Sequence, residues 1–248
     1  MELVERLQVR LEGKANPKTK AWWESYLKMA IPFRGVKMAD TRAALLAWIE
    51  AEEIASRFSL EEQKGLALRL LRETYAEDKI AGILYLQEVL LPARAIDCST
   101  DLPRFAALFD QGYIDDWNTC DWFCVKVLGP LAEQQGEPCA RAIAAWTGAG
   151  TLWQRRAAGV AFVNLAGAGE GNFEGFTDML LEVCAMTVQD PARFAQTGTG
   201  WVLRELGQAE QERVLAFVRE HRVLFSKEAL KRALERMPEE VQQELLQS

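Results

Sequence analysis

The sequence has few residues of the kinds that hold metals or form disulfide frameworks. Its single histidine, His221, has no nearby partners with which to complete a Cys/His zinc set. The five cysteines form no Cys-x-x-Cys pair, and buried reduced thiols are their expected state. Cys120 and Cys124 are spaced to share one helix face, but without a second pair we do not interpret them as metal ligands. We therefore expect no metal and no other cofactor.

Long apolar runs are also absent. No run of about 18 apolar residues occurs, so no segment is predicted to span a membrane. The N-terminal segment MELVERLQVRLEGK has alternating charges where a signal peptide needs an apolar block. We therefore expect a cytoplasmic protein with no membrane partner. Because 49% of the residues are hydrophobic, the chain can bury a sizeable core.

An excess of positive charge is missing as well. The net charge of −7 argues against a protein whose whole surface binds nucleic acid. The charge is uneven along the chain: residues 14–49 contain seven bases and two acids, and residues 73–140 contain four bases and twelve acids. The basic stretch would either grip phosphates or form a solvated face, and both interpretations stay open.

Strand patterns are missing too, since no stretch shows convincing apolar and polar alternation bounded by hairpin turns. Nearly every segment instead has helical spacing. The predicted helices cover residues 2–12, 17–29, 37–54, 60–72, 76–90, 101–110, 116–133, 137–148, 151–166, 174–188, 191–206, 208–221, 227–236 and 238–246. Capping residues or prolines mark several helix starts: Asn16-Pro17, Ser59 with Glu62, Asp190-Pro191 and Ser226.

Short helices with brief links indicate helical hairpins that stack side by side. Each hairpin has an apolar flank that only its neighbour can bury, as in helical-repeat proteins. We therefore predict an all-α fold, a HEAT-like solenoid that forms a single domain over residues 1–248. The repeats are degenerate in sequence, so a globular all-helical bundle remains the alternative. A solenoid curves, and its concave face would suit an extended partner.

The segment Asp115–Leu128, DDWNTCDWFCVKVL, combines aromatic and acidic residues at the start of a predicted helix. Trp117 and Asp121 are four residues apart and therefore share one helix face. Phe123 and Val127 follow the spacing of a face that packs inward. An aromatic ring beside a carboxylate on one surface is a candidate functional site.

A Pro-Phe-x-Gly turn ends the helix that precedes it in the segment Tyr26–Gly35. The simpler interpretation is a helix stop in which Gly35 has a positive φ angle. The alternative adds Tyr26 and Lys28 as groups that face a phosphate backbone.

Two later segments join tryptophan to arginine. Arg155 and Arg156 lie in an opening helical turn, where the helix dipole disfavours bases unless an anion or an internal carboxylate such as Asp121 compensates. Trp201 and Arg204 are three residues apart and share one face. Each tryptophan alone is more often part of a core, and each arginine alone is more often a solvated or paired surface group.

Four elements, in this order and at this spacing, resemble the AlkD family of bacterial alkylpurine DNA glycosylases. They are Tyr26-Leu-Lys…Pro-Phe-Arg-Gly, Trp117-x-x-x-Asp121, Trp153-Gln-Arg-Arg-Ala-Ala and Gly-Trp201-Val-Leu-Arg204. The resemblance covers nearly the whole chain. It implies a HEAT-like superhelix that holds duplex DNA in its concave face. It also implies removal of cationic alkylpurines, of the 3-methyladenine and 7-methylguanine type, without the base extrusion usual for glycosylases.

The resemblance also implies roles for individual residues. Asp121 would be the carboxylate next to the anomeric carbon of the lesion, and Trp117 and Trp201 would contact its deoxyribose. The candidate DNA-binding residues are basic or aromatic: Tyr26, Lys28, Arg155, Arg156 and Arg204. We expect a monomer whose partner is duplex DNA containing alkylated purines.

The chemistry agrees with these roles. A purine alkylated at N3 or N7 is positively charged and leaves easily, so no strong general acid is needed. A carboxylate can stabilise an oxocarbenium-like sugar and place a water, while aromatic faces attract the cationic sugar.

The sequence departs from the family pattern in three ways. The acids of residues 73–140 should weaken non-specific DNA binding. Asn118 stands where an acid often follows the motif tryptophan, and Trp122 adds a ring after Asp121. Two other functions therefore stay open: a non-catalytic HEAT-repeat scaffold that binds DNA structures or a protein partner, and an enzyme acting on bulky adducts.

Overall fold

The computed structural model describes residues 2–247, and among them it contains helices, turns and loops but no strand. Contacts divide the chain into two compact units, Met1–Val127 and Leu128–Ser248. The prediction of an all-α protein is confirmed. The prediction of one domain over residues 1–248 stays a prediction. No helix within residues 2–247 is long and apolar enough to cross a membrane.

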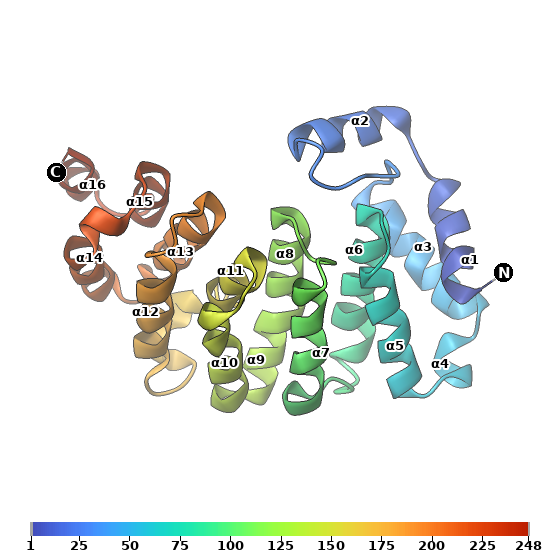
Figure 1. Cartoon of the computed structure of the whole chain (residues 1–248). Helices are drawn as coiled ribbons and strands as arrows, with labels where there is room; N and C mark the ends of the chain where they lie inside the picture. The colour runs from blue at the N-terminus through green and yellow to red at the C-terminus, as the bar shows by residue number, and fades with distance from the viewer. Residues whose placement is uncertain (1, 248) are drawn as a thin grey trace. The chain divides into compact units, whose positions relative to one another are not determined.

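The first unit begins with a long run of α-helices (Figure 1). They are α1 (Leu3–Glu12), α2 (Pro17–Tyr26), α3 (Met38–Ala51), α4 (Ile54–Arg57), α5 (Leu60–Leu71), α6 (Ala76–Tyr85), α7 (Cys98–Asp110) and α8 (Trp117–Phe123). A π-helical turn, η1 (Leu86–Leu90), extends α6, and another, η2 (Cys124–Leu128), extends α8. α6 is the centre of this unit, because it packs on α3, α5 and α8 and every one of its residues is buried.

The second unit continues with short paired helices. They are α9 (Gly129–Gln135), α10 (Glu137–Ala144), η3 (Ala145–Gly148), α11 (Leu152–Val160), η4 (Ala166–Gly171), α12 (Phe176–Thr187), α13 (Arg193–Leu206), α14 (Gln211–Glu220), η5 (Arg222–Leu224), α15 (Lys227–Leu234) and α16 (Glu239–Gln247). α13 is central here, since it packs on α11, α12 and α15. Gly200 allows the closest approach, because a Cβ at this position would collide with the carbonyl oxygen of Ala229 on α15.

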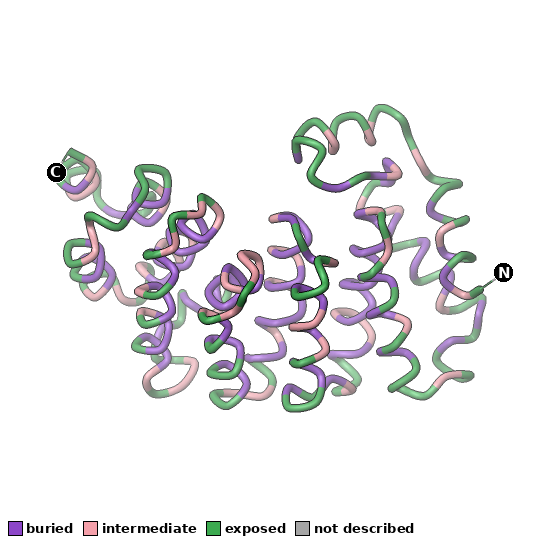
Figure 2. Tube along the Cα trace, viewed as in Figure 1, coloured by how far each residue is buried: buried purple, intermediate pink, exposed green. Residues whose placement is uncertain are grey.

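Buried residues alternate with exposed ones along the helices of each unit, which is the pattern that helical spacing predicts (Figure 2). Phe123 and Val127 are fully buried, as predicted for the inward face of the segment that follows Trp117. Trp48 is also fully buried, and its indole Nε1 donates to the carbonyl oxygen of Leu3. The cores therefore come from long apolar side chains at helical spacing.

Most of the predicted helix starts are confirmed. Ser59 accepts a hydrogen bond from the Glu62 amide, and the Glu62 carboxylate accepts one from the Ser59 amide. Asn16 and Ser226 accept hydrogen bonds from the first turns of α2 and α15. The predicted start at Asp190-Pro191 is wrong, because α13 begins at Arg193; the Asp190 carboxylate accepts from the amide of Ala192, which lies before the helix.

Candidate active site

The helix that carries Trp117 and Asp121 begins with a buried carboxylate. Asp116 lies immediately before α8, and its Oδ1 accepts a hydrogen bond of 2.9 Å from the amide of Thr119. Its Oδ2 has no hydrogen-bond partner among residues 2–247. Burial raises the pKa of this carboxyl above its ordinary value of 3.8, against the opposing effect of the bonds from Thr119. Asp116 therefore fixes where α8 starts and so places Trp117.

Two substitutions of Asp116 distinguish the contribution of its capping hydrogen bond from that of its negative charge. Asp116→Ala should lower the free energy of unfolding by about 1 kcal/mol, because a first-turn amide loses its acceptor. Asp116→Asn keeps an acceptor oxygen and should be close to the wild type at pH 7. Urea unfolding of both variants measures the difference, and equal losses in the two variants at pH 7 would contradict the capping role.

The pH dependence of Asp116 has a definite sign. Because the folded pKa is raised, this carboxyl contributes stability that is fully present below the unfolded pKa of about 3.8 and is lost as the pH rises through the folded pKa. Stability of the wild type relative to Asp116→Asn should therefore fall as the pH rises from about 4 toward 7.

Trp117 and Asp121 lie in one helix, as predicted, and both side chains are partly exposed. The ring of Trp117 meets the ring of Tyr26 edge to face, with centroids 5.7 Å apart. Trp117 also packs, with Trp23, on a cluster of buried residues that includes Leu27. Tyr26 and Trp117 are 91 residues apart in the sequence, so the fold of the first unit brings these two predicted residues together.

The turn that follows α2 is pinned by a buried acid. Gly35 has a φ angle of +93°, as predicted, and a Cβ there would collide with the carbonyl oxygen of Asn16. The carboxylate of Glu77 accepts hydrogen bonds of 2.8, 2.8 and 2.9 Å from the amides of Arg34, Gly35 and Val36. The positive φ of Gly35 is thus confirmed, but α2 ends earlier than predicted, at Tyr26, and Lys28 and Met29, both with positive φ angles, lead the chain out of the helix. Lys28, just past the end of α2, is exposed.

Trp122 faces the interior of the first unit. It lines a cavity of about 130 Å³ together with Asn118 of the same helix and with Trp23, Phe33 and Ile80. The Nζ atom of Lys126 lies 5.8 Å from the centroid of its ring. Asn118 is buried. Asn118 and Trp122, the two departures from the family pattern near Asp121, therefore both line this cavity of the first unit.

The other predicted residues belong to α11 and α13, which pack together in the second unit. Arg156 is buried, and its Nη1 donates a hydrogen bond of 2.6 Å to the carbonyl oxygen of Phe194. The ring of Trp153 lies 5.0 Å from that of Phe194. Trp201, on α13, is partly exposed. Arg156 thus joins the two helices from which Trp153 and Trp201 project.

Arg155 is engaged within the second unit. Its Nη2 lies 2.8 Å from Oδ2 of Asp190, and its Nη1 donates to the carbonyl oxygens of Ala149 and Gly150. The sequence suggested that a carboxylate would compensate a base near the start of this helix. Asp190 supplies that carboxylate for Arg155.

A double-mutant cycle tests the Arg155–Asp190 pair. Arg155→Ala and Asp190→Ala should each destabilise the protein, and together they should cost less than the sum, with a coupling energy of about 1 kcal/mol. Thermal or urea unfolding of the four proteins gives this number. Strictly additive losses would mean that the pair contributes nothing to stability.

Arg204 shares its guanidinium with two acids. Its Nη2 lies 2.7 Å from Glu205 and its Nη1 lies 2.6 Å from Glu235. Glu205 also pairs with Arg236. Burial lowers the pKa of Arg204, but these acids outweigh that effect and raise it overall, so the side chain is a permanent cation.

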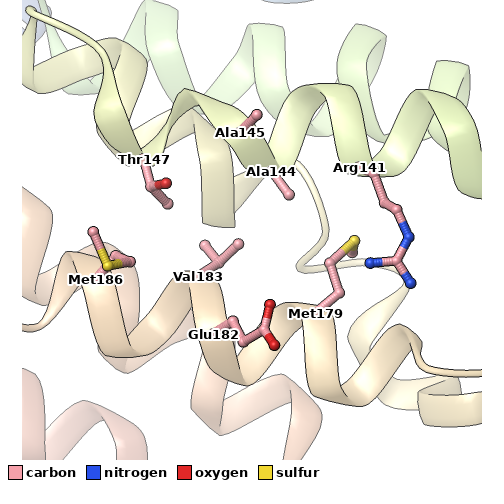
Figure 3. Close-up of a pocket in the computed structure, with 8 residues that line it drawn as sticks. All are labelled: Arg141, Ala144, Ala145, Thr147, Met179, Glu182, Val183 and Met186. Atoms are coloured by element: carbon pink, nitrogen blue, oxygen red, sulfur yellow. The ribbon is translucent and has the colours of Figure 1, made fainter.

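A pocket of the second unit lies apart from these residues. It has a volume of about 240 Å³ and lies between α12 and the segment formed by α10 and η3, where Val183 projects toward Ala144 and Met186 lies nearest Thr147 (Figure 3). None of the predicted site residues lines it. The predicted site residues therefore lie outside this pocket.

The structure gathers the predicted residues into two sets. Tyr26, Trp117 and Asp121 belong to the first unit, and the arginines and Trp201 belong to α11 and α13 of the second. Sequence reasoning missed the roles of three acids: Glu77 as acceptor for the Gly35 turn, Asp116 as the cap of α8, and Asp190 as the partner of Arg155. The role of Asp116 had a local signal, since an aspartate three residues before Thr119 fits a helix cap.

The cysteines differ in part from the expected reduced state. Cys120, Cys124 and Cys184 are free and buried, as expected. Cys98 and Cys139 are not free thiols, which corrects the expectation for these two. No group of three or more His, Cys, Asp or Glu side chains within residues 2–247 is arranged to hold a metal ion.

Comparison with known proteins gives a consistent result. A family model described as DNA alkylation repair enzyme matches residues 7–237. No curated protein sequence matches the chain. A solved structure described as a predicted DNA alkylation repair enzyme from Enterococcus faecalis is similar, with a TM-score of 0.72 and 18% identity, over 91% of this chain and 98% of that one. At this identity the likeness shows the fold, an all-helical repeat fold as the sequence predicts.

Proposed function

Because the chain belongs to the DNA alkylation repair enzyme family, we propose that it is a monofunctional DNA glycosylase. Its reaction is hydrolysis of the N-glycosidic bond of cationic alkylpurines in duplex DNA. The observation that supports this proposal best is the placement of Trp117 and Asp121, which lie one turn apart on α8 and are both partly exposed. They present an aromatic ring and a carboxylate on one helix.

The proposed chemistry needs only these groups. An alkylated purine already carries positive charge, so breaking its bond to the sugar leaves a neutral base and an oxocarbenium-like sugar. The carboxylate of Asp121 stabilises that positive charge and orients the attacking water. The face of Trp117, and that of Trp201 by match to the family motif, adds cation–π attraction to the sugar. Because no pocket for the base is required, the base stays stacked.

DNA contacts are assigned to basic and aromatic side chains of both units. Tyr26 and Lys28 are exposed at the end of α2 and are the contacts proposed for the first unit. Arg204 is partly exposed and permanently charged, which suits a phosphate. Arg156 is buried against α13 and Arg155 is paired with Asp190, so their proposed role is to orient α11 near the DNA. The proposed acting form is a monomer.

Release of free base tests this function. Duplex DNA carrying 7-methylguanine and 3-methyladenine is incubated with the protein at low salt, and the soluble bases are separated by chromatography. The proposal predicts release of both methylated purines and no release of guanine or adenine. A folded protein that releases neither would contradict it.

A second function, a non-catalytic scaffold for DNA structures, is favoured by one observation. The guanidinium groups of Arg155 and Arg204 are paired with acids of the chain itself, which reduces their attraction to phosphates. Gel-shift titrations with an abasic-analogue duplex and an undamaged duplex discriminate between the two functions. Tighter binding to the abasic analogue favours the glycosylase, whereas equal binding to both favours the scaffold.

A further inference from the structure

Helix α2 is unusual in the first unit because none of its residues is buried. Figure 2 shows its trace as exposed and intermediate, and Figure 1 shows it standing out from the remaining helices of that unit. An amphipathic surface helix normally buries one apolar stripe. α2 nevertheless carries three large aromatic side chains, Trp22, Trp23 and Tyr26. The contacts of these three rings show which of them pack on the protein and which are available to a ligand.

Trp23 anchors the helix. Its ring stacks on that of Phe33, with centroids 5.6 Å apart and an angle of 7° between the planes. Lys20 and Glu24 add polar links, since Lys20 Nζ donates to the carbonyl oxygen of Phe33 and Glu24 accepts from its amide. These contacts hold α2 to the turn that Glu77 pins. Trp22 takes no part in these contacts with the turn.

Trp22 and Tyr26 form a stacked pair that points to solvent. Their ring centroids are 5.3 Å apart and their planes differ by 7°. Trp22 is 58% exposed and Tyr26 is 55% exposed. Met29, just beyond, is 70% exposed. Leaving such apolar area in water is costly, and a contiguous exposed patch of this kind marks a binding surface.

The charges around the pair are positive. Lys18 lies four residues before Trp22, so Lys18, Trp22 and Tyr26 follow one side of α2 at helical spacing. Lys18 and Lys28, which flank the pair along the chain, are exposed and make no ion pair among the described residues. The nearest acid of the helix, Glu24, is paired with Lys20 at 3.3 Å. Lysines that border aromatic faces are the pattern by which proteins hold the backbone and the bases of a nucleic-acid strand.

We propose that the surface formed by Lys18, Trp22 and Tyr26 is a binding site for single-stranded DNA, in which unpaired bases stack on the Trp22–Tyr26 pair. A paired base in a duplex has both faces covered by its neighbours, so only an unpaired or unstacked base can meet an aromatic face. The lysines hold the phosphates of the same strand. This site goes beyond the proposed excision of alkylpurines from duplex DNA and does not depend on it.

Binding of fluorescent oligonucleotides to the full chain tests the site. The probes are a single strand of thymidines, an abasic strand of equal length and charge, and an unmodified duplex. The thymidine strand should bind at least about fivefold more tightly than the abasic strand, because only the former offers rings to stack. Equal affinity for these two strands would overturn the proposal. No alkylated base is present, so the result is independent of glycosylase activity.

Substitutions at Trp22 separate stacking from apolar contact. Trp22→Ala and Trp22→Leu should each weaken binding of the thymidine strand about fivefold or more, and Trp22→Phe should retain most of the affinity. Lys18→Ala should reduce the slope of log affinity against log salt by about 0.7. Leu60→Ala, which removes another exposed side chain of the first unit, is the control and should change nothing. Unchanged affinity in Trp22→Ala would overturn the proposal.

Two measurements distinguish lost stacking from a folding defect and from self-association. Circular dichroism should show unchanged helix content in Trp22→Ala, because the Trp22 ring is 58% exposed and meets Trp23 only edge to face, with centroids 4.8 Å apart, while Trp23 keeps its stacking on Phe33. Sedimentation of the wild type should show no dimer that Trp22→Ala abolishes. Such a dimer would mean that the patch joins two copies of the chain, and it would overturn the assignment to DNA.

Discussion

Asp121→Asn should fold normally and lose excision of alkylpurines by at least about 100-fold in kcat, the size of effect seen when a key electrostatic contact to a transition state is removed. Asparagine has nearly the same shape as aspartate, so helix α8 and the packing of Phe123 should not change. Only the negative charge disappears. Without it, the positive charge that develops on the sugar has no matched counter-charge, and the water is not oriented.

The control for this experiment is Asp115→Asn, which removes the same charge from an exposed residue that precedes α8. Its kcat should stay within about twofold of the wild type, because an exposed charge interacts only weakly with groups a few residues away. Single-turnover release of 7-methylguanine measures both variants. If the two aspartates cause equal losses, the effect is one of general charge and the role of Asp121 is contradicted.

Glu77→Ala should lower the free energy of unfolding by about 3 kcal/mol or more, the largest stability loss expected in the first unit. Its carboxylate accepts three backbone hydrogen bonds, and each buried amide left without an acceptor costs about 1–3 kcal/mol. The melting temperature should therefore fall by roughly 6 °C or more. Hydrogen exchange should speed up most at Arg34, Gly35 and Val36.

Two other substitutions serve as an intermediate case and a control for Glu77→Ala. Glu77→Gln retains one oxygen but turns an NH2 group toward a backbone donor, so its loss should fall between those of the wild type and Glu77→Ala. Glu50→Ala removes an exposed acid from α3 and should change stability by less than about 0.5 kcal/mol. A Glu77→Ala protein as stable as Glu50→Ala would show that the Gly35 turn is held by other contacts.

Part of the negative charge of residues 73–140 is buried in the folded protein. Of the twelve acids in residues 73–140, four are buried: Glu77, Asp78, Asp101 and Asp116. Asp78 pairs with Arg34 at 2.8 Å, and Asp101 pairs with Lys64 at 3.0 Å. Their negative charge is used inside the first unit. The surface of this region therefore repels DNA phosphates less strongly than the number of acids in residues 73–140 indicates.

Local signals predicted much of the fold. Helical spacing, the Ser59–Glu62 capping box and the positive φ of Gly35 each depend on a few neighbouring residues, and all are confirmed. The start of α13 was predicted two residues early, at Pro191; Asp190 caps no helix, and its Oδ1 accepts from the amide of Ala192 while its Oδ2 pairs with Arg155. A long-range ion pair of this kind leaves no trace in local sequence.

The sequence predicted which site candidates share a helix better than it predicted which residues meet across the fold. The motif spacing placed Trp117 and Asp121 on one helix, and the structure does so. The Glu77 carboxylate, by contrast, reaches amides more than 40 residues away, as in its bond to Gly35. Likewise, nothing in the pair Trp22-Trp23 distinguishes the anchor from the exposed ring. Such contacts depend on how the helices of a unit pack, which periodicity alone does not specify.

Identification of the released product tests the central proposal most directly. A duplex with one 7-methylguanine is incubated with the wild-type protein, and both the solution and the strand are analysed by mass spectrometry. Hydrolysis of the N-glycosidic bond predicts free 7-methylguanine in solution and a strand with an abasic site. A strand that keeps its base, either unchanged or restored to guanine by loss of the methyl group, would contradict glycosylase activity.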